Sequence, residues 1–315
     1  MKIVKKIDGF SPQVPNCSVT IGNFDGCHLG HQHLVKKAVS QAKQVRSESV
    51  AITFSPNPKQ FFSKQPAVNL FNERQKSKVL ASLGLDYLII QPFDIPFSKV
   101  SHHSFFNKIR RFNTKFLAIG QNFRFGYQRL GDHHYLKSQC AKHGIQLALI
   151  QPIDFDNEPI SSTRIRKLLQ VQGDVTMAKN LLGRPYTITG TIVKGNQLGH
   201  QLGFPTANLG QIDQLIPKSG VYCGTTTIQV DNTIIKNRAV FNIGVRPTLE
   251  QNDPQLAVEA HLIDFQDGPV LYNKNAEFHF LYRMRDEQKF PSLDTLKAQI
   301  KKDINQSKRL LASLD

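Results

Sequence analysis

The chain has 315 residues, of which 40% are hydrophobic and 20% are charged, and its formal net charge is +16. This length and composition exclude a disordered or fibrous protein and predict two globular domains rather than one. No apolar run approaches the roughly 20 residues that cross a bilayer, and the segment MKIVKKIDGF lacks the apolar core of a signal peptide, so we expect a cytoplasmic protein. The four cysteines form no CxxC pair, which argues against a zinc site and a disulfide framework.

Residues 17–153 alternate between strand-like and helix-like patterns. Apolar side chains between Leu34 and Val45 recur at helical spacing, and a second helical pattern runs from 73 to 83. The strand-like segments around these helices are 17–22, 49–54, 85–93, 115–120 and 146–153. Strands that alternate with helices form parallel βαβ units, so we expect an α/β domain with a doubly wound, Rossmann-like sheet. Ligands of such sheets bind beyond the carboxyl ends of the strands.

Beyond residue 184 the pattern changes to strands without strong helices between them. Clusters of Gly, Pro, Asn and Asp separate the strand-like segments 186–193, 221–230, 233–244, 256–264 and 276–283. An antiparallel β-barrel is the natural closure for such a set. Two helical stretches, 162–170 and 174–182, precede the barrel, and an amphipathic C-terminal helix follows it. We expect domains at 1–183 and 184–315.

The segment GNFDGCHLGHQHLV at 22–35 places three glycines in the turn between the first strand and its helix. Glycines allow a ligand to approach the backbone closely, and the N-terminus of a helix offers N–H groups to an anion. His28 and His31 form an HxGH pattern that brings two imidazoles over one phosphate-sized volume, where they can stabilise phosphoryl oxygens that gain charge. Two alternatives stay open: a metal site that includes His33, and histidines that face solvent without a role.

Asp25 in the same turn has three candidate roles: it orients a motif histidine, helps to hold magnesium, or fixes the turn by accepting backbone hydrogen bonds. We favour the turn role. For the histidine doublets His102-His103 and His133-His134 we favour exposure to solvent without a catalytic role.

The motif GNFDGCHLGH resembles the adenylyl-transfer motif of the nucleotidyltransferase superfamily, in the form found in bacterial bifunctional riboflavin kinase/FMN adenylyltransferases. The similarity continues in IGQNFRFG and LGD within 119–132, in ISSTRIRKLL at 160–169 and in LLGRPY at 181–186. By this resemblance the motif histidines contact the ATP phosphates, and the Ser-Ser-Thr-x-x-Arg segment binds the same nucleotide. The implied residues are His28 and His31 for catalysis, Gly22, Asn23, Phe24, Gly30, Ser162, Thr163 and Arg166 for nucleotide binding, and Asn122 and Asp132 for flavin binding. An N-cap role also stays open for Ser162, which precedes an apolar helical run.

A second candidate site contains Pro205-Thr206-Ala207-Asn208 after a Gly-rich loop. The Thr206 hydroxyl and the Asn208 amide supply oxygen ligands of the kind that Mg²⁺ prefers. The whole segment 183–209 resembles the riboflavin kinase signature, as do GVY, NIGVRPT, VEAHLIDF and RDEQKFPSLDTLKAQIKKD further along the chain. The resemblance implies that Thr206 and Asn208 hold Mg²⁺ and the ATP phosphates, and that Glu259 is the general base for the ribityl hydroxyl. Arg285 is expected to contact the flavin or, as an alternative, phosphate.

Strand alternation alone makes Glu259 one of many outward-facing residues, and Asn242 is as compatible with a turn as with a ligand. Four positions depart from the commoner family pattern: Cys27 for valine, Asn57 for histidine, His200 for arginine and Asn273 for glycine. The loss of a permanent charge at His200 concerns nucleotide affinity more than the presence of activity.

The expected function is therefore two ATP-dependent reactions on one chain. Riboflavin and ATP give FMN and ADP, and FMN and ATP then give FAD and pyrophosphate. Two alternatives stay open: a chain with only one active module, and a basic protein that binds nucleic acid or regulates. We expect riboflavin, FMN and ATP as partners, neither nucleic acid nor a membrane, and a basic surface that helps to gather the anionic substrates.

Overall fold

The computed structural model describes residues 1–64, 67–195, 202–246, 255–265 and 271–312. Contacts between Cα atoms group the chain into two compact units, Met1–Ser162 and Thr163–Asp315. Among the described residues, no helix is both long enough and apolar enough to cross a membrane.

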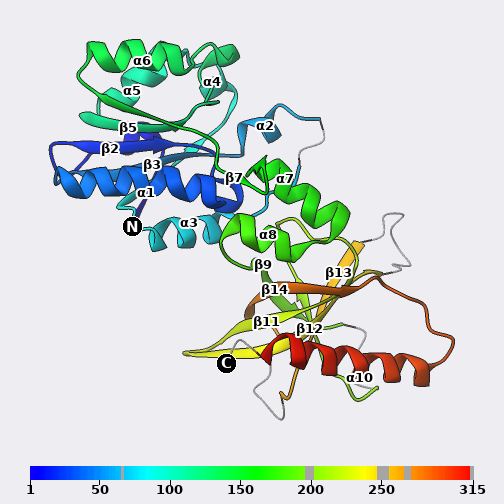
Figure 1. Cartoon of the computed structure of the whole chain (residues 1–315). Coiled ribbons are helices and arrows are strands. Elements are labelled where there is room, and N and C mark those ends of the chain that lie inside the picture. Colours follow the sequence, from blue (N-terminus) through cyan, green and yellow to red (C-terminus); the bar gives the residue numbers. More distant parts are fainter. Residues whose placement is uncertain (65–66, 196–201, 247–254, 266–270, 313–315) are drawn as a thin grey trace. The chain divides into compact units, whose positions relative to one another are not determined.

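The first unit is a six-stranded parallel sheet with helices on both faces (Figure 1). Its strand order is β1-β4-β3-β2-β5-β6, and every neighbouring pair is parallel. The strands are β1 (Lys2–Lys5), β2 (Cys17–Ile21), β3 (Glu48–Ser55), β4 (Tyr87–Pro92), β5 (Thr114–Gly120) and β6 (Gln146–Ile150). The helices are α1 (Leu29–Gln44), α2 (Pro58–Phe61), α3 (Glu73–Ser82), α4 (Ile95–Ser98), α5 (His102–Arg110) and α6 (His133–Lys142). This arrangement confirms the expected doubly wound sheet.

Sequence patterns identify neither β1 nor the helices α5 and α6. β1 has four residues, three of them exposed, because it lies at the edge of the sheet, and it therefore lacks an apolar run. α6 buries only two side chains, Leu136 and Cys140, so its apolar stripe is narrow. A short antiparallel hairpin, β7 (Asp154–Phe155) with β8 (Glu158–Pro159), ends the unit.

Apolar side chains alternate between the two faces of the sheet along its central strands. Val50 and Ile52 of β3 pack into a core cluster with side chains of α5 and α6. Ala51, between them, points to the opposite face and packs with Val35 of α1 and Leu80 of α3. Because both faces are covered, the ends of the strands remain as the place for a ligand.

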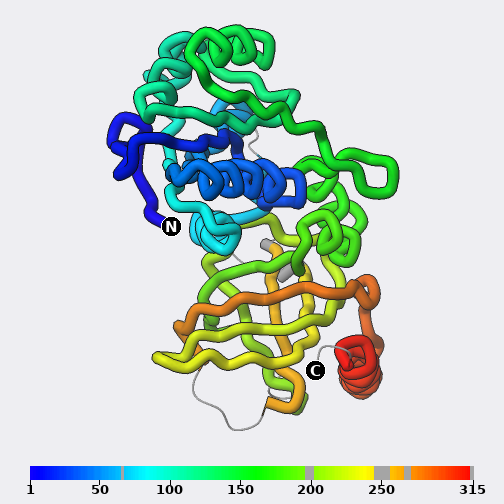
Figure 2. The backbone as a smooth tube through the Cα atoms, turned by 60° about the vertical axis from the view of Figure 1, so that its left-hand side comes forward, coloured from blue at the N-terminus to red at the C-terminus, as the bar shows by residue number. Residues whose placement is uncertain are grey.

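The second unit is a closed six-stranded antiparallel barrel with a helix along its outside (Figure 2). Around the barrel the strand order is β10-β13-β12-β11-β14-β9. The strands are β9 (Tyr186–Val193), β10 (Thr206–Gly210), β11 (Gly220–Val230), β12 (Thr233–Arg246), β13 (Gln255–Leu262) and β14 (Asn275–Arg285). Before the barrel come α7 (Ser162–Lys167), a π-helical turn (Leu168–Gln172) and α8 (Val175–Leu182); after it comes α10 (Leu293–Leu310), which packs against β12. The expected barrel and C-terminal helix are thus confirmed.

The barrel has one strand more than sequence patterns indicate. β10 contains Thr206 and Asn208 and pairs with both β9 and β13, which closes the barrel. Its five residues include asparagine and glycine, both depleted in strands, so the pairing partners rather than the local sequence make it a strand.

Aromatic side chains fill the interior of the barrel. The ring of Phe241 lies 5.2 Å from that of Phe278 and 4.6 Å from that of Phe280, between ring centroids, and all three side chains are fully buried. In a barrel this small the side chains fill the interior, which leaves the outer face and the ends of the barrel for a binding site.

Candidate active sites

The turn from β2 to α1 is anchored to the core by two of its own side chains. Phe24 and Cys27 are fully buried, and the Cys27 thiol donates a hydrogen bond to the Phe24 carbonyl, with 3.1 Å between Sγ and O. Both residues have left-handed backbone conformations, with φ of 48° and 40°, and Gly26 between them has φ of 73°. Non-glycine residues rarely adopt such angles, so the surrounding contacts must hold this backbone in place.

The two motif histidines stack at the start of α1. Their ring centroids are 3.7 Å apart and the ring planes differ by 21°. His28 is the N-cap of the helix, and its Nδ1 accepts a hydrogen bond from the His31 N–H at 3.4 Å. The Phe24 ring meets the His31 ring edge to face at 5.6 Å, and a Cβ on Gly30 would lie 3.2 Å from the His28 ring. Two imidazoles therefore lie together at the N-terminus of a 16-residue helix, which favours anions.

Two segments distant in sequence brace this turn. The buried Asp25 carboxylate accepts a hydrogen bond from the Leu70 N–H at 2.9 Å, which agrees with the turn role favoured from the sequence, although the donor is not local. The Ser162 hydroxyl donates to the Asp25 carbonyl oxygen at 2.9 Å. Thr163 and Arg166 begin the second unit, and their proximity to the two histidines stays a prediction.

The segment after β5 carries the two predicted flavin contacts of the first unit. Asn122 is exposed just beyond the carboxyl end of β5. Asp132 is the N-cap of α6: it accepts a hydrogen bond from the Tyr135 N–H at 2.9 Å and pairs with Arg124 at 2.7 Å. The Tyr135 N–H, followed by Arg124, lowers the pKa of the Asp132 carboxyl. Asp132 thus has a structural task, and its flavin contact stays a prediction.

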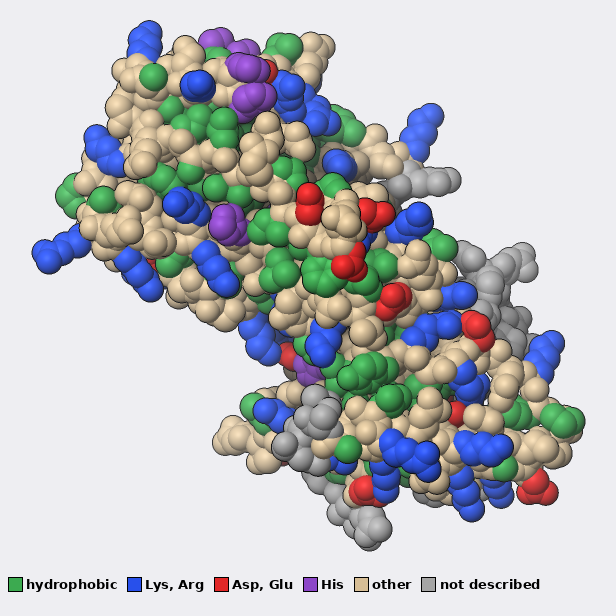
Figure 3. Space-filling model, in the orientation of Figure 1, with side chains coloured by type: hydrophobic (Ala, Val, Ile, Leu, Met, Phe, Trp, Pro, Cys, Tyr) green, Lys and Arg blue, Asp and Glu red, His purple; other side chains and the backbone are tan. Residues whose placement is uncertain are grey.

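His102 departs from the expected exposure to solvent. Its Nδ1 atom is inaccessible, and a Cβ on Gly126 would lie 2.6 Å from its Cα. The neighbouring His103 Nδ1 lies 2.9 Å from the Tyr135 hydroxyl. The side-chain colouring of Figure 3 shows histidines gathered near α6. His102 is therefore only partly exposed, because the segment after β5 lies over one side of it.

The predicted kinase residues lie in one row on the outer face of the barrel. Asn208 of β10 is the register partner of Glu259 of β13, which is in turn the partner of Asn242 of β12. Thr206 is likewise the partner of His261. Register partners on antiparallel strands point to the same face, so these side chains lie side by side. Pairing between strands is what singles out Glu259, and no local pattern contains that information.

A cavity of 310 Å³ lies between this row and α10. Thr206, Asn242 and Glu259 line its polar side. Apolar side chains of α10 line the opposite side, namely Leu296, Ile300 and Ile304. This volume and this mixture of an apolar wall with a few polar groups are typical of a small-molecule site.

Arg285 lines the same cavity, but its nitrogens are occupied within the protein. Its Nη2 donates to the Asp303 carboxylate at 2.7 Å and its Nη1 to the Asp286 carbonyl at 2.9 Å. Asp303 belongs to α10, is only 5% exposed in its side chain, and also accepts a hydrogen bond from Gln299 at 2.9 Å. Arg285 therefore fastens α10 to β14, and its flavin contact stays a prediction. Asp303 was not predicted as a site residue, because no local sequence pattern indicates that it pairs with Arg285, 18 residues earlier in the chain.

Three of the four departures from the family pattern fall on described residues. Cys27 is buried in the turn, as expected for a small apolar substitute. Asn57 is the N-cap of α2 and accepts a hydrogen bond from the Lys59 N–H at 3.0 Å. Asn273 has φ of 63°, a conformation that asparagine tolerates better than most residues, so it replaces glycine at low cost. His200 lies outside the described residues.

Known proteins are similar to this chain over almost its whole length. Residues 11–164 match the family model of FAD synthetase, and residues 182–311 match that of riboflavin kinase. A bifunctional riboflavin kinase/FMN adenylyltransferase from Haemophilus influenzae is 34% identical over 99% of this chain and 100% of its own length. The Escherichia coli K12 protein of the same name is 35% identical over 96% of both chains. Among solved structures, that of a macrolide-efflux protein from Streptococcus pneumoniae has a TM-score of 0.84 and 28% identity, with 98% of both chains covered.

Proposed function

Because the chain belongs to the family of bifunctional riboflavin kinase/FMN adenylyltransferases, we propose that its two reactions use the two sites just described. The enzyme phosphorylates riboflavin to FMN with ATP, and it adenylylates FMN to FAD with release of pyrophosphate. We assign adenylyl transfer to a domain of residues 1–183 and the kinase to residues 184–315. The two family matches, which end at 164 and begin at 182, support this division.

Adenylyl transfer is assigned to the turn between β2 and α1. An FMN phosphate oxygen attacks the α-phosphorus of ATP, and the bond to the pyrophosphate oxygen breaks. The stacked His28 and His31 rings donate hydrogen bonds to phosphoryl oxygens that gain charge as this happens. The other residues assigned to the nucleotide are Gly22, Asn23, Phe24, Gly30, Ser162, Thr163 and Arg166. Positioning and charge stabilisation suffice for this in-line transfer.

Riboflavin phosphorylation is assigned to the row on the barrel. Glu259 accepts the proton of the ribityl 5′-hydroxyl, whose oxygen attacks the γ-phosphorus of ATP while ADP leaves. The row supports this assignment because it places Glu259 beside Asn208 at the edge of a cavity of suitable size. The apolar wall of α10 provides a surface for the isoalloxazine ring. Arg285 in this site, and Asn122 and Asp132 in the first unit, are the proposed polar contacts to the flavin.

The residues on β10 fit Mg²⁺. The Thr206 hydroxyl and Asn208 amide oxygens are hard ligands on one face of a strand. Among the described residues, no group of three or more His, Cys, Asp or Glu is arranged to hold a metal. In this proposal the phosphates of ATP and water molecules supply the remaining ligands. Bound Mg²⁺ would neutralise charge on the β- and γ-phosphates.

We place both reactions in the cytoplasm, with no nucleic acid or membrane partner. All four cysteines are free thiols and buried, which suits a reducing compartment. Lysine and arginine side chains spread over the face in Figure 3 and gather over α10, where Lys301 and Lys302 are exposed. In this proposal the positive charge attracts ATP and FMN.

The observation that carries the site assignment is the register row of Asn208, Glu259 and Asn242, in which Glu259 and Asn242 line the cavity together with Thr206. The test is to incubate the chain with ATP, Mg²⁺ and either riboflavin or FMN, and to separate FMN from FAD by chromatography. Glu259→Gln should stop FMN formation while FAD still forms from added FMN. His31→Ala should stop FAD formation from added FMN, while FMN still forms from riboflavin. If either variant retains both reactions, the corresponding site is wrong.

A further inference from the structure

The carbonyl oxygen of Asn23 is held by two side chains from other elements. The Lys76 ammonium of α3 donates to it at 3.0 Å, and the Thr53 hydroxyl of β3 donates to it at 3.1 Å. The ammonium also lies 3.4 Å from the Thr53 hydroxyl oxygen, so the three groups form a closed triangle. Lys76 lies outside every motif named in the sequence.

The held carbonyl belongs to the peptide that leads into the catalytic turn. A trans peptide is planar, so its N–H points away from its C=O. With the Asn23 oxygen directed at Lys76, the Phe24 N–H points to the opposite side. Within the described part of the chain, this N–H has no hydrogen-bond acceptor. It is therefore a backbone donor at the point where the left-handed segment from Phe24 to Cys27 begins.

Lys76 lies where a charged group is costly. Its side chain is half-buried and lines a cavity of 50 Å³ at the ends of β3 and β4, together with Thr53, Ser55 and Asn69. Burial lowers the pKa of the Lys76 ammonium, and the negative charges that Cys27, Asp25 and Glu73 can carry oppose this shift in part. An apolar residue would avoid the desolvation cost, and Thr53 alone could still satisfy the Asn23 oxygen. Structural stability therefore gives no reason for a lysine here.

We propose that Lys76 is a positioning residue for adenylyl transfer, which holds the Asn23 carbonyl so that the Phe24 N–H and the stacked pair of His28 and His31 are presented to the nucleotide phosphates. The proposal rests on the assignment of adenylyl transfer to these histidines. A misplacement of about 1 Å at such a site costs about 100-fold in rate, so a contact that fixes one peptide has a measurable effect.

The test measures both reactions and the melting temperature of Lys76→Met, Lys76→Arg and Thr53→Val. For Lys76→Met we expect the kcat of FMN adenylylation to fall about 10- to 100-fold with KM for ATP changed less, while riboflavin phosphorylation stays within about twofold. The Tm should be unchanged or higher, because a desolvated charge is removed. Lys76→Arg keeps a cationic donor and should recover part of the lost kcat. Thr53→Val should lower kcat in the same direction by a smaller factor.

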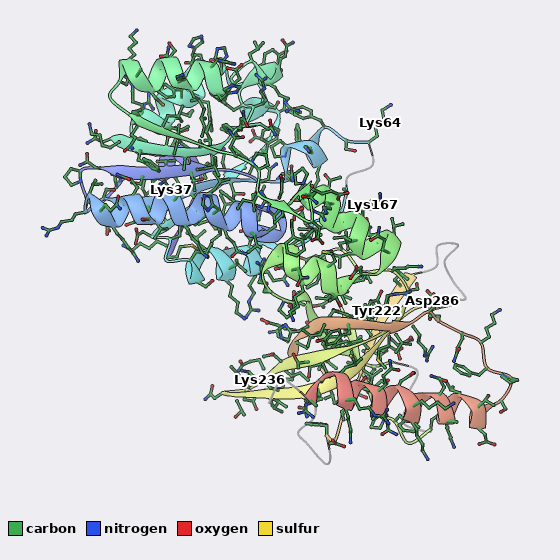
Figure 4. All side chains as sticks on the ribbon, viewed as in Figure 1. Lys37, Lys64, Lys167, Tyr222, Lys236 and Asp286 are labelled. Atoms are coloured by element: carbon green, nitrogen blue, oxygen red, sulfur yellow. The ribbon has the colours of Figure 1, made fainter. Side chains whose placement is uncertain are left out.

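Lys37→Met is the matched control, because Lys37 is exposed on α1 (Figure 4). Adenylylation by Lys76→Met at the rate of the parent chain overturns the proposal. A loss of adenylylation that appears only together with a lowered Tm also overturns it, since that is the result of a structural role. If Lys76→Met does not fold, Thr53→Val decides the question by the same criteria. His31→Ala tests the site assignment separately: if it leaves adenylylation intact, the site itself is wrong.

Discussion

Gly195 lies against the side chain of Asn208 so closely that a Cβ on Gly195 would be 2.6 Å from the Asn208 amide carbon. Asn208 is 6% exposed and is the register partner of Glu259. The glycine after β9 therefore sets the position of the amide that we assign to Mg²⁺ and ATP. A side chain at residue 195 must displace either the backbone or this amide.

Gly195→Ala should impair the kinase alone. We expect riboflavin phosphorylation to fall at least about tenfold, because the Asn208 oxygen moves from its place beside Glu259. Adenylylation of FMN should be unchanged. Steady-state assays of both reactions check this, with Gly9→Ala as control, since nothing lies within 4 Å of a Cβ at Gly9. Kinase activity equal to that of the parent chain would show that Gly195 does not set the position of the Asn208 amide.

Asp303→Asn should loosen α10 from the barrel. The substitution removes the charge that holds Arg285, whose side chain is 23% exposed, and hydrogen bonds to charged groups contribute roughly 2 kcal/mol each. We expect a loss of about that size in the free energy of unfolding in urea, and a higher KM for riboflavin because α10 forms one wall of the cavity.

Asp264→Asn is the control for this change. Its pair with Lys308, at 2.7 Å, is exposed on both sides, and such pairs contribute less than about 1 kcal/mol. Equal losses in the two variants would mean that the bond between Arg285 and Asp303 has no special role.

Ser162→Ala should weaken the brace on the catalytic turn. The lost hydroxyl donates to the Asp25 carbonyl, and a neutral hydrogen bond contributes about 1 kcal/mol, which corresponds to a factor of about five in rate if the turn must be held for catalysis. FMN adenylylation should fall by about that factor and the kinase should not change. Ser77→Ala on α3 serves as control. Unchanged adenylylation would leave Ser162 without the proposed task.

The sequence predicts those parts of the sites whose information is local. The His28 and His31 stack follows from a spacing of three residues at the start of a helix, and the doubly wound sheet follows from long apolar runs. β10 was not predicted, because Thr206 and Asn208 become strand residues only through their partners on β9 and β13. Contacts such as Arg285 with Asp303 join residues on separate elements and leave no local pattern.

The contact made by Lys76 in the first unit could not be predicted from the sequence for the same reason. Its contact with the Asn23 carbonyl joins residues 53 positions apart. In the sequence it is one of 40 lysines and arginines, and nothing distinguishes it from an exposed residue of α3. Only the fold shows that this ammonium is half-buried and directed at the catalytic turn.

Acidification should destabilise the protein in part through His102. Burial, followed by the neighbouring His103, lowers the pKa of the His102 imidazole, and Asp132 only partly opposes this. Its Nδ1 is buried and has no hydrogen-bond partner among the described residues, so protonation would place a cationic N–H where no acceptor lies. Because the folded pKa is below the unfolded one, the unfolded chain binds more protons as the pH falls below about 6.5, and stability decreases in that direction.

His102→Asn should therefore reduce the loss of stability between pH 7.5 and pH 5.5. The asparagine cannot take up a proton, so the difference in proton binding between the folded and unfolded chains becomes smaller and the pH dependence of the urea midpoint flattens. His33→Asn, at an exposed position on α1, is the control and should leave that dependence as it is in the parent chain. If the two variants have the same pH dependence, the His102 imidazole is not the group that titrates.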